Sequence, residues 1–231
     1  GELRAPDMLA LKRAVPDLHE IKVPGGAIGI YFNPFAPPFD NEKLRQAVVF
    51  GLQRQQLIDI VTQGTGTLSG AANGGPPGWG LVWSPDELKK LYAYDAAKVK
   101  RLLAEGGKPG GFSFTLAATP RQSLGVAALE IVQQQLAPLG IQVKLETQDF
   151  TTFIANRNDL KFQAVSHIGA PSEEPGAELL RWFLTRNKRY GNDKELDALM
   201  EKMAATVDTA KRKELLNQVD RMIIEKGFAG V

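Results

Sequence analysis

The stretch FSFTLAATPRQSLGVAALEIVQQQLAPLGIQVKLE, residues 112–146, decides the fold of this chain. Its first residues place Phe112, Phe114 and Leu116 between polar neighbours, and this alternation predicts a strand. Apolar residues at helical spacing follow up to Gly140, which is typical of a helix end. The last six residues alternate again. Strand, helix and strand in one short stretch predict a βαβ crossover with parallel strands, and therefore an α/β fold.

Further elements are predicted on both sides of this stretch. AIGIYFNPF (27–35) has the composition of a strand, and Asn41 or the preceding Asp can cap a helix. We expect that helix to present one continuous apolar face from Leu44 to Val61, followed by a loop at 64–80. The other predicted elements are helices at 95–107, 149–158, 195–205 and 209–226, and a strand at 161–169.

Composition excludes several classes of protein. The 231 residues are 43% hydrophobic and 23% charged, which is the balance of a globular domain. A net charge of +2, with basic residues spread along the chain, predicts no nucleic-acid partner. The absence of cysteine excludes disulfides and thiolate chemistry. No apolar run approaches the roughly 20 residues that span a bilayer.

The Gly-rich segment GTGTLSGAANGG (64–75) has two interpretations. A phosphate-binding loop requires a preceding strand and a Lys that reaches the phosphates. This segment follows a predicted helix and contains no Lys. We therefore interpret it as a loop that ends the helix.

Candidates for metal binding or catalysis are few. The chain has two histidines and no His or Cys pair at ligand spacing, so we predict no metal site and no cofactor. His167 lies near a predicted strand end, where ligands often approach α/β sheets. Glu173 and Glu174 could form a carboxylate pair, or they could belong to a solvated loop. No complete catalytic set is recognisable.

Aromatic and charged residues near predicted loops suggest a binding pocket instead. Trp79, Trp83, Arg121, His167 and Trp182 are of the types that line small-molecule sites. Taken alone, each of these residues is better explained by a structural role. Trp182 lies in the apolar run ELLRWFL, which favours a place in the core.

Four ordered segments resemble the extracytoplasmic solute-binding proteins of the peptide/nickel/opine ABC importers (family 5). The four segments are IYFNPFAPPFDNEKLRQAVVFGLQRQQLID, LYAYDAAKVKRLLAEGG, ALEIVQQQLAPLGIQVKLETQDFTTF and ELDALMEKMAATVDTAKRKELLNQVDRMIIEKG. Together they cover most of residues 27–227. The resemblance implies a lobe of the type II periplasmic-binding-protein fold, with a mixed sheet flanked by helices.

The resemblance also implies a domain organisation and a function. Residues 1–28 would enter from the first lobe or hinge, and residues 29–231 would form the second lobe. The whole protein would be a monomeric, non-enzymatic receptor at the periplasmic or extracellular face of the cytoplasmic membrane. It would bind an oligopeptide, opine or metal chelate between its lobes and deliver it to an ABC permease.

Binding residues are inferred by comparison with dipeptide-binding relatives, which carry Gly-Trp-x-Gly-Asp at a strand end. The corresponding stretch here is VSHIGAPSEEPG, with His167 near the aromatic position, Gly169 at the Gly and Ala170 at the Asp. This departure argues against simple dipeptide binding, although Glu173 or Glu174 could compensate. Arg121 lies near the place of a carboxylate-binding Arg. The predicted ligand-binding residues are Trp79, Arg121, Ser166, His167, Gly169 and Ala170.

Two other functions remain open at this point. An α/β enzyme could act on a carboxylated or phosphorylated metabolite, with His167 and Glu173 or Glu174 as acid–base groups. An interaction module without a small ligand would present a flat surface.

Overall fold

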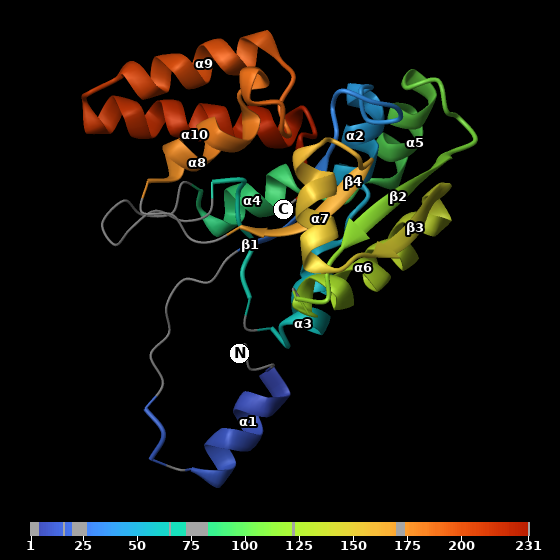
Figure 1. Ribbon diagram of the computed structural model, residues 1–231, viewed down its shortest axis with the longest axis vertical. Helices are drawn as coiled ribbons and strands as arrows, with labels where there is room; N and C mark the ends of the chain where they lie inside the picture. Colours follow the sequence, from blue (N-terminus) through green and yellow to red (C-terminus); the bar gives the residue numbers. More distant parts are fainter. Residues whose placement is uncertain are drawn as a thin grey trace.

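A mixed sheet with strand order β3-β2-β4-β1-β5 forms the centre of the chain in this computed structural model (Figure 1). The structure describes residues 5–15, 17–19, 27–64, 66–72, 83–121, 123–169 and 174–230. The strands are β1 (Ala27–Phe32), β2 (Phe112–Ala118), β3 (Ile141–Thr147), β4 (Ala164–Gly169) and β5 (Ala229–Gly230). The helices are α1 (Ala5–Ala14), α2 (Glu42–Phe50), α3 (Arg54–Val61), α4 (Pro85–Leu91), α5 (Ala96–Glu105), α6 (Ser123–Leu136), α7 (Phe150–Asn158), α8 (Pro175–Phe183), α9 (Lys194–Ala205) and α10 (Thr209–Glu225), with 3₁₀ turns η1 (Ala137–Leu139) and η2 (Thr185–Asn187).

Strand pairing confirms the predicted βαβ crossover. β2 and β3 are parallel along their whole length, from Phe112 opposite Ile141 onward, and α6 connects them. β2 is also parallel to β4, whereas β1 runs antiparallel to both β4 and β5. The sheet is therefore mixed and flanked by helices, as predicted. β5, which pairs with β1 at Tyr31, was not predicted.

Alternating residues of each strand face two hydrophobic clusters on opposite sides of the sheet. Ile30 and Phe32 of β1 pack in the first cluster with buried residues of α2, α5 and α6. Tyr31 lies between them in sequence and packs in the second cluster with α8, α9 and α10. These three helices lie together on one side of the sheet, coloured orange to red (Figure 1).

The expected continuous helix face from Leu44 to Val61 is wrong, because the chain breaks between α2 and α3. Gln135 of α6 satisfies the backbone groups at the break: its Oε1 accepts from the Gln53 N–H at 2.9 Å, and its Nε2 donates to Gln53 O. The buried Arg54 guanidinium donates to Val49 O at 2.9 Å near the end of α2. Tertiary contacts therefore override the local helical pattern here.

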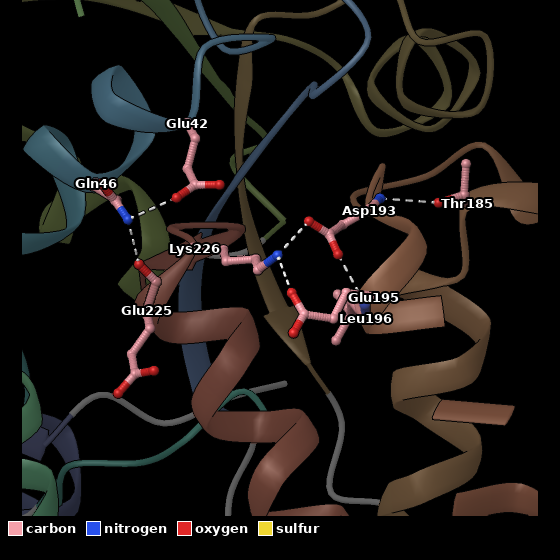
Figure 2. A network of polar contacts seen from close by, with 8 residues as sticks. All are labelled: Glu42, Gln46, Thr185, Asp193, Glu195, Leu196, Glu225 and Lys226. Atoms are coloured by element: carbon pink, nitrogen blue, oxygen red, sulfur yellow. Dashed lines mark hydrogen bonds and ion pairs between the residues drawn. The ribbon is translucent and has the colours of Figure 1, made fainter. Parts of the chain in front are cut away.

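A polar network joins the end of α10 to α9 and α2 (Figure 2). Lys226 Nζ lies 2.5 Å from Asp193 Oδ2 and 3.1 Å from Glu195 Oε2 at the start of α9. Gln46 of α2 donates from Nε2 to the backbone carbonyl of Glu225 at 2.8 Å. The Lys226 and Asp193 side chains are only about one fifth exposed, so this pair is better shielded from solvent than a surface ion pair. The network fixes the C-terminal helix pair against the rest of the fold.

None of the helices in the described ranges combines the length and apolar character needed to cross a bilayer.

Candidate functional site

The parallel strands β2, β3 and β4 all end at one edge of the sheet, which we call the carboxyl edge. β1 begins at the same edge, because Ala27 lies opposite Gly169 in the antiparallel pairing of β1 with β4. In open α/β sheets, ligands bind beyond the carboxyl ends of the strands. This edge is therefore the candidate binding site.

Arg121 lies at the carboxyl edge, three residues after the end of β2. Its guanidinium carbon sits 4.3 Å from the centre of the Phe150 ring at the start of α7. The loop between β3 and α7 is tied to β2, because Gln148 N–H donates to Ala118 O at 2.9 Å. Arg121 is exposed and Phe150 is 39% exposed. A guanidinium in this position can donate two hydrogen bonds to a ligand carboxylate.

Two hydroxyl groups near this edge are buried without a partner. Ser166 of β4 is 1% exposed, and so is Thr119, which directly follows β2. Within the part of the chain that the structure describes, neither Ser166 Oγ nor Thr119 Oγ1 has a hydrogen-bond partner. Because Ala117 is level with Val165 in the parallel register, Ser166 is level with Ala118, the last residue of β2 and the one before Thr119. Buried polar groups are normally paired, so these two mark the edge as incomplete by itself.

Thr119 was not predicted from the sequence. The sequence feature that could have identified Thr119 is its position as a polar residue immediately after an apolar strand, in the run LAATP (116–120). Such a position faces the carboxyl edge in any βαβ unit.

The other predicted binding residues are placed only in part. His167 and Gly169 belong to β4, where they pair with Gly29 and Ala27 of β1, and their backbone lies at the carboxyl edge. Trp79 and Ala170 lie outside the described residues. The structure therefore brings Arg121, Ser166 and the backbone of β4 to one edge, and the ligand contacts of all six residues remain predictions.

Trp83 is a core residue, in agreement with the structural interpretation of this tryptophan and not with the pocket interpretation. It is 5% exposed and packs in the first hydrophobic cluster. Its indole N–H donates to Asp220 Oδ2 of α10. Trp182 packs against the second hydrophobic cluster, stacked 5.6 Å from the Tyr190 ring, as the core interpretation predicted.

Of the acid–base side chains of the enzyme alternative, the structure describes only that of Glu174. Glu174 pairs with Arg212 of α10, and Glu173 lies outside the described residues. Within the described ranges, no three acidic or histidine side chains cluster so that they could hold a metal ion.

Comparison with solved structures places this architecture among type II periplasmic binding proteins. The PBP AgaA from A. tumefaciens R10, in complex with agropinic acid, is 25% identical, with a TM-score of 0.73 over 89% of this chain and 43% of that chain. A periplasmic oligopeptide-binding protein from Thermotoga maritima with bound mannohexaose shares the fold at 18% identity, with a TM-score of 0.80 over 97% of this chain and 48% of that chain.

Residues 3–191 match the family of bacterial extracellular solute-binding proteins, family 5, middle region. Di/tripeptide-binding protein 1 of Pseudomonas aeruginosa (strain UCBPP-PA14) is 31% identical over 96% of this chain and 42% of that protein. The chain belongs to the family 5 solute-binding proteins, and it spans less than half the length of these relatives. Members of this family bind substrates, and the enzyme alternative is not supported.

Proposed function

We propose that this chain is the second lobe of the substrate-binding component of an ABC importer. Residues 1–28 would enter from the first lobe or hinge, and residues 29–231 would form the lobe. The complete protein binds a short peptide or a related small polar solute outside the cytoplasmic membrane and presents it to the permease. It acts as a monomer and by binding, without turnover.

The observation that carries this proposal is the similarity to a di/tripeptide-binding protein across 96% of the chain. The site chemistry is consistent with it, because a guanidinium suits the carboxylate of a peptide and the hydroxyls suit its amide groups. The unpartnered hydroxyls of Thr119 and Ser166 support a site that a ligand or a second lobe completes. Trp79, His167, Gly169 and Ala170 are proposed as further contacts at the same edge.

The function is tested with the full-length protein that contains this chain. Native mass spectrometry against an equimolar mixture of di- and tripeptides should show one bound peptide per protein. Arg121→Gln should weaken that binding about tenfold or more, since a charge-assisted hydrogen bond to the carboxylate is lost. Arg101→Gln, at an exposed position of α5, is the matched control and should leave binding unchanged. Absence of binding across peptides, opines and metal chelates would contradict the proposal.

The 231-residue chain alone should be folded and should bind the same peptides weakly or not at all. A lobe by itself supplies contacts from one side only and cannot close around a ligand to exclude water. Isothermal titration calorimetry on the chain and on the full-length protein measures the difference. A micromolar dissociation constant for the chain alone would show that the second half of the cleft is unnecessary.

A further inference from the structure

Phe150 is an exposed aromatic residue at the first position of α7. Its side chain is 39% exposed, although removing a phenyl ring from water is favourable. The next aromatic residue of the same helix, Phe153, is 1% exposed and packs in the second hydrophobic cluster. Packing of the core therefore accounts for Phe153 but not for the position of the Phe150 ring.

The main chain that carries Phe150 is held in place beside the end of β2. The N–H of Gln148 donates to Ala118 O, the carbonyl of the last residue of β2, at 2.9 Å. Asp149 caps α7, because its Oδ1 accepts from the N–H groups of the second and third residues of the helix at 3.0 and 3.1 Å. The Phe150 ring thus projects from a fixed piece of backbone at the carboxyl edge.

Arg121 lies against the face of this ring. Its guanidinium carbon is 4.3 Å from the centre of the Phe150 ring, well inside the range of a cation–π contact. Among the residues that the structure describes, no carboxylate forms an ion pair with Arg121. Attraction to a ring face comes from the positive charge, so it restrains the guanidinium and leaves its N–H donors available to a ligand.

We infer that Phe150 is a positioning residue for Arg121 in the solute site. This inference rests on the proposed function, in which Arg121 binds the carboxylate of a peptide. A long side chain loses rotamer freedom when it binds a ligand, and this loss weakens binding. The Phe150 ring reduces the loss, because it restrains the guanidinium before the solute arrives. Phe150 therefore acts through Arg121 and makes no contact of its own with the solute.

The pairing itself is tested on the 231-residue chain by NMR, without any solute. The ring current of Phe150 should shift the Cδ–H resonances of Arg121 upfield. Phe150→Leu should remove this shift, and Phe150→Tyr, which keeps the ring face, should preserve it. Phe35→Leu is the matched control, since Phe35 is 37% exposed and follows the end of β1 at the opposite edge of the sheet. Arg121 resonances that do not respond to Phe150→Leu would overturn the inference.

The positioning role is tested on the full-length protein by isothermal titration calorimetry. The probe is the peptide that binds most tightly in the mixture of di- and tripeptides. Phe150→Leu should raise its dissociation constant about threefold, the factor that corresponds to one exposed cation–π contact. Phe150→Tyr and Phe35→Leu should leave the dissociation constant at the wild-type value.

A double substitution separates positioning from a direct contact and from a general effect on the fold. In the Arg121→Gln background, Phe150→Leu should weaken binding no further, because the side chain that Phe150 positions is gone. A threefold loss in both backgrounds, or in neither, would overturn the role. If the wild type binds no peptide, the proposed function fails and the role fails with it. A wild type that binds peptides no better than Phe150→Leu overturns the role alone.

Discussion

Gly111→Ala should destabilise the chain by about 2–5 kcal/mol, through a left-handed backbone penalty and a steric overlap that add together. Gly111 has φ +90°, and a Cβ atom there would overlap the carbonyl group of Gly140. That carbonyl accepts from the Phe112 N–H at 3.2 Å, next to the first pair of the β2–β3 ladder. The added methyl group therefore pushes apart the strands on which the sheet is built. Urea unfolding followed by circular dichroism measures the loss.

Gly107→Ala is the matched control for this prediction. Gly107 has φ +73°, and a Cβ atom there would meet nothing within 4 Å. Only the backbone penalty of about 1–2 kcal/mol should remain. Equal losses in the two variants would show that close packing of Gly111 against Gly140 does not matter, and the steric argument would be wrong.

Local sequence signals were sufficient for most elements of the fold. Alternation predicted β2 and β3, and the side chains of Asn41, Asp95 and Asp149 accept backbone N–H bonds at the starts of α2, α5 and α7. Gly140 adopts φ +82° between η1 and β3, as its place after the helix predicted. These features depend on neighbours in the chain, so they can be recognised without the tertiary structure.

Features that depend on distant residues could not be predicted in this way. The break after α2 is stabilised by Gln135 of α6, which accepts a hydrogen bond from the Gln53 N–H. β5 is only two residues long and is stabilised by its pairing with β1. The hydrogen bond from the Trp83 indole to Asp220 could not be predicted, because the two residues lie 137 positions apart. A signal was present, since Asp220 follows Leu216 at helical spacing on the apolar face of α10.

In the candidate site, too, some features follow from the local sequence and others depend on distant residues. Strand-end reasoning and the family resemblance named Arg121 and Ser166 as ligand contacts, and that role stays a prediction. In the structure, Arg121 follows β2 by three residues, and Ser166 of β4 lies level with the end of β2. Thr119 was missed because its burial follows from packing around the end of β2, and the strand pattern alone does not show it. The ligand contacts proposed for Trp79, His167, Gly169 and Ala170 stay predictions.

Asp220 should also make global stability depend on pH in a defined direction. Its pKa is raised from 3.8 to about 6 in the folded chain by burial. Between these values the folded state holds a proton that the unfolded state has lost, so the contribution of Asp220 to stability falls as pH rises. A shift of this size corresponds to about 3 kcal/mol, fully present below the unfolded pKa and lost above the folded one.

Comparison with Asp220→Asn isolates this contribution, because all other groups titrate alike in both proteins. The free energy of unfolding of the wild type minus that of the variant should be largest near pH 4 and should fall by up to about 3 kcal/mol by pH 7. Urea denaturation at several pH values measures the difference. Protonation of Asp220 in acid removes a buried charge and weakens one of its hydrogen bonds, from the Ala72 N–H or the Trp83 indole N–H. Removal of the charge has the larger effect on stability, so acid should stabilise the fold through Asp220. A difference that stays constant or rises with pH would mean that Asp220 is ionised throughout and that its donors fully compensate its burial.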